Sequence, residues 1–586
     1  MSQKYYANER NVQILIYLLK AYKVKKIIAS PGTRNFSFVA SLQQDPFFEM
    51  YSCIDERSAA YMACGLAEES GEPVVITCTG ATASRNYMPG LTEAYYRKLP
   101  VIAVTGDTNY SRVGHLFPQV IDRSSRPMDI SILSERINPV NSPNEEWDAV
   151  IRVNRALLEI NHRGGGPVHI DLVTGNCQDF TIKQLPECRV ISRWFKSDEM
   201  PKIEEEKIAI FVGSHRRMSS SEVLAIDDFC TKYNAVVFCD HTSGYYGKFK
   251  IQLALVNWQL AMISEIRNLD LLIHIGEVSG DYSGSKISAK KVWRVSEDGE
   301  LKDTFMTLTD VFEMTDLEFF SYYATNNNSL DTLDSFYEKC KRETDSVLSK
   351  IPELPYSNAW VAQQLYSGIP HESVVHFGIL NSLRAWNFYP LHESIESHCN
   401  VGGFGIDGPL STLIGASFAD QSKLHFLFVG DLAFFYDMNA LGNRYVGSNI
   451  RILLINNGRG AEFRIFCHPA FSFGQEADRF IAASGHNGNK SDDLVRNYVE
   501  NLGFEYLSAH SKDEFLTYKE HFLDSKIRKK PMLFEVFTSE IEENEALEIL
   551  SDIEKSSLGI VNKIANQILD EKSKERIKKV YRIIKK

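Results

Sequence analysis

Short apolar runs alternate along the chain with longer amphipathic stretches. The runs hold four to six residues and lack strict apolar–polar alternation, which is typical of strands buried on both faces of a parallel sheet. The stretches between them, such as residues 11–21 and 221–233, have the periodicity of helices that cover such a sheet. The pattern therefore predicts an α/β fold of doubly wound, mainly parallel sheets. The strands that it predicts most clearly are residues 26–30, 74–77, 101–105, 208–212, 271–275, 424–429 and 450–455.

Two polar stretches divide this pattern into three parts. Residues 197–207 are highly charged and contain a proline, and residues 340–355 are also polar, so we interpret both as linkers. A length of 586 residues fits this division, because single cores rarely grow beyond about 250–300 residues. The sequence predicts three α/β domains and a basic C-terminal helix, at residues 1–190, 191–350, 351–560 and 561–586.

Composition and charge exclude several classes of function. The formal net charge of −12 and the pI of about 5.8 argue against a nucleic-acid-binding protein, because no basic surface dominates. No stretch approaches the ~20 apolar residues that a membrane helix needs, and the first residues have no signal-peptide core. The ten cysteines are scattered without zinc-type spacing, so we expect reduced thiols in a cytoplasmic protein.

Polar residues follow two of the predicted strands. Asp431 follows the run at 424–429 after one glycine, and Asn457 comes after the run that begins at residue 450. Because the carboxyl ends of parallel strands open on the same edge of a sheet, we expect the two side chains to face each other. A carboxylate, an amide oxygen and a nearby backbone carbonyl suit Mg²⁺, which takes its remaining ligands from phosphate and water. Taken alone, each of these residues would also fit an ordinary turn.

The segment from residue 429 to 460 resembles the signature of thiamine diphosphate (ThDP)-dependent enzymes, in which Gly-Asp is followed, one helix later, by Asn-Asn. Leu432 stands at a position that is more often glycine. Residues 28–35 and 51–71 resemble the pyrimidine-binding domain of the same family, in which a glutamate contacts the aminopyrimidine ring of the cofactor. Glu56 occupies that position, and a buried carboxyl there would share a proton with the ring. The resemblance thus implies ThDP and Mg²⁺ as cofactors, and pyrimidine-binding, central Rossmann-like and diphosphate-binding domains in that order.

Within that family, the order of short motifs resembles the SEPHCHC synthase branch, whose enzyme decarboxylates 2-oxoglutarate and adds the product to isochorismate. The matching motifs are SPGTR, DER, TGATAS, TGD, GFGIDG and GDL. The resemblance implies a homodimer or a homotetramer. It also implies cofactor contacts at Glu56, Gln119, Ile406, Gly430, Leu432 and Asn457, metal contacts at Asp431, Asn457 and the Arg459 carbonyl, and substrate contacts at Thr33 and Arg34.

Several positions depart from that branch. Thr108, Trp386 and Val401 stand where the synthase has arginines that hold the carboxylates of its substrates. Arg384 is a candidate substrate contact that would replace one of them. Glu462 stands where the synthase has an aliphatic residue, and we predict that it is a catalytic acid or base. The alternative for Glu462 is a solvent-facing glutamate at the start of a helix.

The resemblance, with these departures, predicts an enzyme that uses ThDP and Mg²⁺ to decarboxylate a small-molecule 2-oxo acid. The resulting enamine would be protonated or added to an acceptor carbonyl or enone, and the lost arginines favour an acceptor other than isochorismate. Two alternatives stay open: the SEPHCHC synthase of menaquinone biosynthesis itself, and an inactive ThDP-fold protein with a binding or regulatory role. FAD has little support, because the central part lacks a G-x-G-x-x-G motif after a strand.

Overall fold

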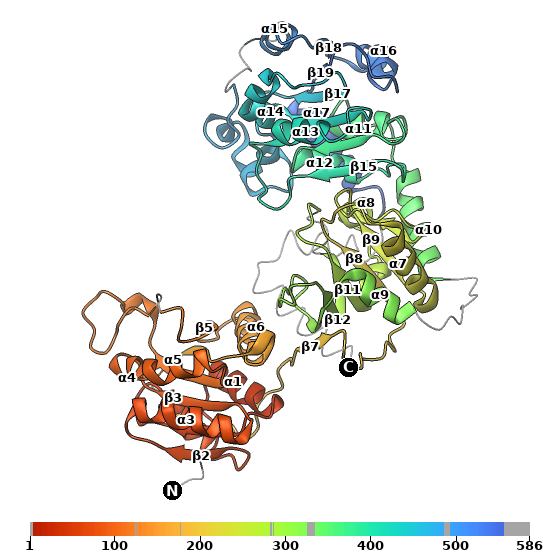
Figure 1. The fold of residues 1–586 in the computed structure, drawn as a ribbon. Coiled ribbons are helices and arrows are strands. Elements are labelled where there is room, and N and C mark those ends of the chain that lie inside the picture. The colour runs from red at the N-terminus through yellow and green to blue at the C-terminus, as the bar shows by residue number, and fades with distance from the viewer. Residues whose placement is uncertain are drawn as a thin grey trace. The chain divides into compact units, whose positions relative to one another are not determined.

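The computed structural model describes most of the chain, which folds as two compact units (Figure 1). Unit 1 comprises Met1–Phe195 and Gly299–Glu313, and unit 2 comprises Lys196–Asp298 and Met314–Lys586. The helix predicted at residues 561–586 lies outside the described residues. Those that are described are residues 4–555 apart from 124, 126, 176, 282, 283, 285, 325–334, 486–490 and 492. In this part of the chain, no helix is long and apolar enough to cross a membrane.

Unit 1 contains a six-stranded parallel sheet with helices on both faces. Its strands are β1 (Lys26–Ala29), β2 (Glu49–Ser52), β3 (Val74–Cys78), β4 (Val101–Asp107), β5 (Leu133–Ile137) and β6 (Val168–Val173). Unit 1 also contains β7 (Ser192–Phe195) and β13 (Leu308–Glu313), which pair with each other in parallel. Its helices are α1 (Arg10–Ala21), α2 (Phe36–Leu42), α3 (Glu56–Ser70), α4 (Thr82–Asn86), α5 (Met88–Tyr96) and α6 (Pro143–Glu159). The strand order of the sheet is β2-β1-β3-β4-β6-β5.

Strand β4 explains why the predicted strands are apolar throughout. Successive side chains of a strand point to opposite faces, and both faces of this sheet are covered. Ile102 and Val104 therefore pack in one core with α1 and α6, whereas Val101 and Ala103 pack in a second core with α3 and α5.

Unit 2 contains two further parallel sheets. The central sheet is formed by β8 (Ile208–Val212), β9 (Val236–Cys239), β10 (Lys250–Gln252), β11 (Asn268–Ile275) and β12 (Ser288–Val295), and its helices are α7 (Ser220–Tyr233), α8 (Ala254–Trp258), α9 (Asp316–Ala324) and α10 (Phe336–Ser349). The C-terminal sheet is formed by β14 (Val374–Phe377), β15 (Glu396–Cys399), β16 (His425–Gly430), β17 (Ile450–Asn456), β18 (Glu505–Ala509) and β19 (Met532–Phe537). Its helices are α11 (Asn358–Leu365), α12 (Asn381–Asn387), α13 (Pro409–Ser417), α14 (Asp431–Asp437), α15 (Leu494–Asn501), α16 (Lys512–Phe522) and α17 (Glu540–Ser551). Within unit 2 the strand orders are β10-β9-β8-β11-β12 and β15-β14-β16-β17-β19-β18.

The structure confirms the predicted fold class, and each strand predicted from an apolar run overlaps an observed strand. The linker predicted at residues 340–355 is wrong, because residues 336–349 form α10 with Cys340 and Val347 buried. These two side chains lie two turns apart on one face of the helix, and the polar residues that suggested a linker cover its exposed face. The division into three domains stays a prediction.

Candidate active site

Asp431 and Asn457 meet at the carboxyl edge of the C-terminal sheet. Strand β16 ends directly before Asp431, which begins α14, and the neighbouring strand β17 ends at Asn456. The Asp431 carboxylate accepts hydrogen bonds from the backbone N–H groups of Leu432 (2.6 Å), Asn457 (3.2 Å) and Gly458 (2.6 Å). Gly458 has a φ of +79°, a left-handed conformation that glycine adopts without strain. The carboxylate therefore ties the start of α14 to the loop after β17.

The same two residues fit a hard cation. Asp431 is 2% exposed, and burial raises the pKa of its carboxyl to about 6, although the backbone N–H groups act in the opposite direction. Asn457 Oδ1 is buried and accepts no hydrogen bond from the described residues. Buried oxygens without a partner are rare, and Mg²⁺ would satisfy both this oxygen and the carboxylate. The donor set therefore fits a magnesium ion held by oxygen ligands.

These residues line a cavity of about 150 Å³ in unit 2. The cavity lies at the carboxyl edge of the sheet, where parallel α/β proteins commonly bind their ligands. The structure brings together on its wall all of the cofactor, metal and catalytic residues that were predicted for this part of the chain, and their roles stay predictions. They are Ile406, Gly430, Asp431, Leu432, Asn457, Arg459 and Glu462.

One acidic residue of the cavity escapes prediction from the sequence. Glu543 lies near the start of α17, is 8% exposed and lines the same cavity as Asp431. Its Oε1 accepts hydrogen bonds from the backbone N–H of Asn358 (3.0 Å) and from the hydroxyl of Thr538 (2.7 Å). Burial, and to a smaller extent the charge of Asp431, raises the pKa of Glu543 to about 7. In the sequence it is one acid in the run EIEENE, and nothing in that run distinguishes it.

Glu462, which lines the cavity, forms an ion pair with Arg384. Two guanidinium nitrogens of Arg384 donate to the two carboxylate oxygens, at 2.8 and 2.9 Å. Arg384 also donates to Asn381 Oδ1 (2.5 Å), and its guanidinium carbon lies 5.6 Å from the ring centroid of Trp258. The structure thus joins two residues that were predicted for separate roles, substrate binding and proton transfer.

Two of the positions that lack the expected arginines lie in the apolar core. Trp386 is fully buried, and its ring centroid lies 3.9 Å from that of Phe428. Val401 is 3% exposed. A guanidinium at either position would be buried among apolar groups, which is unfavourable without a partner. Helix α12 therefore directs Arg384, rather than the side chain at position 386, toward Glu462.

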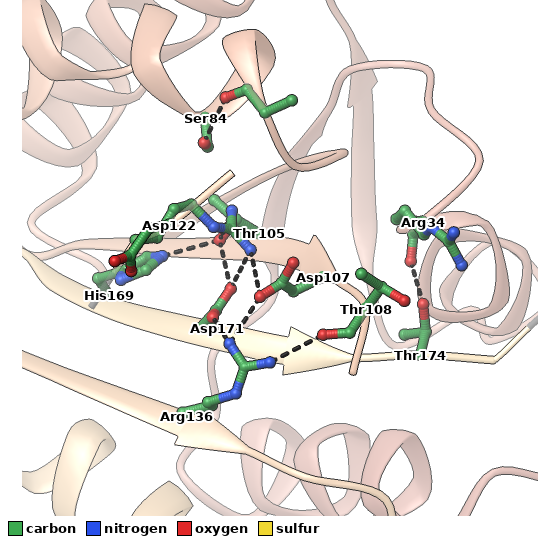
Figure 2. A network of polar contacts seen from close by, with 12 residues as sticks. Arg34, Ser84, Thr105, Asp107, Thr108, Asp122, Arg136, His169, Asp171 and Thr174 are labelled. Atoms are coloured by element: carbon green, nitrogen blue, oxygen red, sulfur yellow. Dashed lines mark hydrogen bonds and ion pairs between the residues drawn. The ribbon is translucent and has the colours of Figure 1, made fainter. Parts of the chain in front are cut away.

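The predicted residues of unit 1 follow strands of its sheet, in loops or at the start of a helix. Glu56 is the first residue of α3 and is half-buried. Thr33 and Arg34 lie in the loop between β1 and α2, and the Arg34 carbonyl accepts a hydrogen bond from Thr174 Oγ1 (2.5 Å; Figure 2). Gly106 allows this close approach, because a Cβ at that position would lie 2.4 Å from the carbonyl carbon of Arg34. The end of β6 thus holds the loop that carries the predicted substrate contacts.

A buried charge network fixes the end of β4 in unit 1 (Figure 2). Asp107 on β4 and Asp171 on β6 each pair with Arg136 at 2.6 Å, and both also pair with Arg123. Arg136 in addition donates to the carbonyl of Thr108 (2.8 Å). Burial raises the pKa of Asp171 to about 7, and the charge of Arg123 acts in the opposite direction. The network places two arginines near Thr108, and both are engaged by carboxylates.

The loop after β4 carries Gln119, which is exposed and has a φ of +60°. Leu116 and Phe117, shortly before it, are exposed apolar side chains. Clusters of this kind often mark surfaces that contact a ligand or another chain. The role of Gln119 as a cofactor contact stays a prediction.

Comparisons with known proteins identify relatives over nearly the whole chain. The family described as "Thiamine pyrophosphate enzyme, N-terminal TPP binding domain" matches residues 10–125. The 2-succinyl-5-enolpyruvyl-6-hydroxy-3-cyclohexene-1-carboxylate synthase of Bacteroides fragilis is 31% identical over 573 residues, which cover 93% of this chain and 99% of that protein. The proteins of the same name from Bacteroides thetaiotaomicron and Phocaeicola vulgatus are 30% and 31% identical, and the matches cover 93% and 91% of this chain and 98% and 96% of those proteins.

A solved structure, "Rhodococcus jostii RHA1 thiamine diphosphate-dependent 4-hydroxybenzoylformate decarboxylase", is 16% identical, with a TM-score of 0.40. The match covers 90% of this chain and 99% of that one. A structural similarity of this size supports no conclusion about the activity of this chain.

Proposed function

Because the chain belongs to the family of thiamine diphosphate-dependent enzymes, among the relatives of SEPHCHC synthase, we propose that it is a Mg²⁺-dependent decarboxylase or carboligase of a 2-oxo acid. The observation that carries this proposal is the contact of Asp431 with Asn457, whose Oδ1 lacks a partner among the described residues. Such a pair at a sheet edge suits a cation that bridges protein and diphosphate. The proposal includes an assembly of two or four chains in the cytoplasm.

The residues of the chain would have separate tasks in this reaction. Asp431, Asn457 and the carbonyl of Arg459 would hold Mg²⁺, and through it the diphosphate. When bound, ThDP supplies the carbanion chemistry that breaks or forms a bond next to a carbonyl. Glu56 would hold a proton at the ring nitrogen of the aminopyrimidine. Loop residues 33–34 would contact the substrate.

Glu462 enters this proposal as a candidate acid or base. Its carboxylate lines the cavity, but both oxygens accept hydrogen bonds from Arg384. While that contact holds, both oxygens act as hydrogen-bond acceptors of the guanidinium. A proton-donating role would therefore require Glu462 to leave Arg384 during the reaction.

The names of the relatives favour a second candidate, the SEPHCHC synthase reaction itself. Against it stand the buried apolar side chains of Trp386 and Val401, at positions where that branch carries arginines. An inactive binding protein is the third candidate. The joint presence of Glu56, Asp431 and Asn457 argues against it, because an inactive protein would not need all three predicted cofactor and metal contacts.

The experiment that tests the proposal is a screen for CO₂ release. The purified protein is incubated with ThDP, Mg²⁺ and a panel of aliphatic and aromatic 2-oxo acids, with and without aldehyde acceptors. We expect at least one acid to release CO₂ only when both cofactors are present. Binding of ThDP without CO₂ release from any acid would favour the inactive protein, and no binding of ThDP would contradict the proposal altogether.

A further inference from the structure

Glu462 and Arg384 also bear on which substrates the cavity accepts. We propose that the Glu462 carboxylate takes the place on Arg384 that a substrate carboxylate would otherwise take. This wall of the cavity therefore accepts an uncharged substrate group and rejects a second carboxylate of the substrate. This inference rests on the proposed function, and it assigns Glu462 and Arg384 to specificity rather than to proton transfer.

The geometry of the pair is the one that a substrate carboxylate would adopt on an arginine. The guanidinium donates two parallel hydrogen bonds, of 2.8 and 2.9 Å, to the two oxygens of Glu462. Arginine binds carboxylates of ligands in this same bidentate way. Asn381 Oδ1 and the ring of Trp258 hold the guanidinium from other sides, so Arg384 is already oriented for a carboxylate. Glu462 fills the place that a dicarboxylic substrate would need.

Other arginines next to the cavity are paired in the same way. Arg459, which lines the cavity, contacts Asp478 at 2.8 Å and also pairs with Glu540. Arg464, further along the same loop, pairs with Asp478 and Glu540 as well. These two arginines are therefore balanced by carboxylates of the chain itself. A substrate that reaches this wall meets a surface without net positive charge.

An exchange between Glu462 and a substrate carboxylate is unfavourable. The two side chains are only 14% (Arg384) and 18% (Glu462) exposed, so little water would hydrate a displaced carboxylate. A displaced Glu462 would keep its charge without a partner. This cost outweighs the gain from a new contact of the same kind between Arg384 and the substrate. The pair is therefore expected to stay closed while substrate binds. A distal carboxylate then lies next to Glu462 and is repelled by it.

The test compares glutarate with valerate, two unreactive five-carbon acids that differ by one distal carboxylate. Isothermal titration calorimetry is carried out on the protein loaded with ThDP and Mg²⁺. Wild type should bind glutarate no more tightly than valerate. Glu462→Ala opens the place of the carboxylate and removes the carboxylate that pairs with Arg384. It should bind glutarate at least about tenfold more tightly than wild type does, as a charge-assisted bidentate contact allows. Glu462→Gln keeps the size of the side chain and should show a smaller gain in affinity for glutarate. This variant provides the test if the alanine variant misfolds.

The matched control is the double variant Arg384→Gln/Glu462→Ala, which has the same added space but no guanidinium. It should lose the gain for glutarate and bind valerate as Glu462→Ala does. The inference is overturned if wild type already prefers glutarate, if neither single variant gains affinity, or if the double variant keeps the gain. Because binding is read without turnover, a failure here is distinct from a failure of the CO₂ screen. If the screen is positive, Glu462→Ala should also shift CO₂ release from monocarboxylic toward dicarboxylic 2-oxo acids.

Discussion

Glu56 is the residue on which the proposed proton transfer depends. It begins α3, but the N-terminus of this helix is capped by Asp55, whose carboxylate accepts from the backbone N–H of Arg57 (3.2 Å) and from the hydroxyl of Ser58 (2.7 Å). An acid at a helix start is often explained by capping. Here the neighbouring aspartate already supplies that function, so a chemical role is the better explanation for Glu56.

Replacing Glu56 with glutamine tests that role. Glu56→Gln keeps the size of the side chain and its ability to hydrogen bond, but it cannot exchange a proton with the cofactor. We expect ThDP affinity within about threefold of wild type and turnover lower by roughly a hundredfold or more, the usual contribution of a positioned proton-transfer group. Calorimetry and CO₂ release measure the two quantities. Glu69→Gln, on the exposed surface of the same helix, should change neither. Turnover close to wild type in Glu56→Gln would exclude the role.

At this scale, the sequence predicts contacts that follow from regular geometry and misses those that depend on loops. Asp431 and Asn457 could be placed together because adjacent parallel strands end on one edge. The pairing of Arg384 with Glu462 could not be predicted, since the two residues are 78 positions apart and meet only through the turn after β17. Glu543 arrives from α17, near the end of the described chain, and no motif marks it.

Among the elements, β17 contains a charged residue in an otherwise apolar strand. Arg451 is 2% exposed, yet the run was correctly predicted as a buried strand. Its guanidinium donates to the backbone carbonyls of Phe522 (3.3 Å), Asp524 (3.1 Å) and Lys526 (2.8 Å). Arg451 thus fastens the loop after α16 to the sheet and satisfies carbonyls that the loop would otherwise leave unpaired.

Loss of these hydrogen bonds should destabilise the C-terminal sheet. Arg451→Met keeps the aliphatic stem but leaves the carbonyls without donors, and we expect a loss of about 2–4 kcal/mol in the free energy of unfolding. Urea denaturation followed by fluorescence measures it. Arg528→Met, which removes a partly exposed ion pair with Asp524, should lose less than about 1 kcal/mol. Equal stability of Arg451→Met and wild type would show that the contacts contribute nothing.

Three adjacent strands, β15, β14 and β16, each carry a histidine. His376 on β14 is 5% exposed, and its ring centroid lies 5.3 Å from that of His398 on β15. Burial, and to a smaller extent the neighbouring His398 and His425, lowers the pKa of His376 to about 3. Burial also lowers the pKa values of His398 and His425. The folded sheet therefore favours the neutral form of all three rings.

The sign of the resulting pH dependence follows from these depressed values. A histidine whose pKa is lower in the folded state stabilises the fold fully above its unfolded pKa of about 6.5, and stability falls as the pH decreases below that value. For His376 the decrease continues toward pH 3, by at most about 1.4 kcal/mol per pH unit. His376→Leu should therefore weaken the pH dependence of the melting temperature between pH 6.5 and about 4.5. His115→Leu, at an exposed position of unit 1, should leave it unchanged. A melting temperature of wild type that does not fall over this range would contradict the account.

At the scale of the whole molecule, the hydrophobic pattern was sufficient for the fold class. Strands buried on both faces give apolar runs that stand out from the amphipathic helices between them, and this contrast does not depend on long-range contacts. The pattern failed at residues 340–355, where a helix with a narrow buried face resembled a linker. Loops could not be predicted, and the loops after β1, β4 and β17 carry most of the residues that would meet a substrate.

The substrate of the whole enzyme is where this chain should differ from its relatives. The resemblance places Thr108, Trp386 and Val401 at positions where that branch has arginines, and Arg384 is paired with Glu462. Each lost charged hydrogen bond contributes ~1.5–3 kcal/mol, so the loss of two would lower efficiency by about a hundredfold or more. We expect little or no cyclohexene product from 2-oxoglutarate and isochorismate, measured by liquid chromatography. Efficient synthesis of that product would identify the chain as a SEPHCHC synthase and refute the altered specificity.

The most direct test of the central claim is a calorimetric titration with ThDP in the presence and absence of Mg²⁺. Wild type should bind ThDP only with the metal, because in the proposed site Asp431 and Asn457 would hold the diphosphate through the cation. Asp431→Ala should weaken binding by about a hundredfold or more, or about 2.7 kcal/mol, whereas Asp228→Ala, on the exposed face of α7, should bind as wild type does. Binding of ThDP that is equally tight without Mg²⁺, or unchanged in Asp431→Ala, would contradict the account.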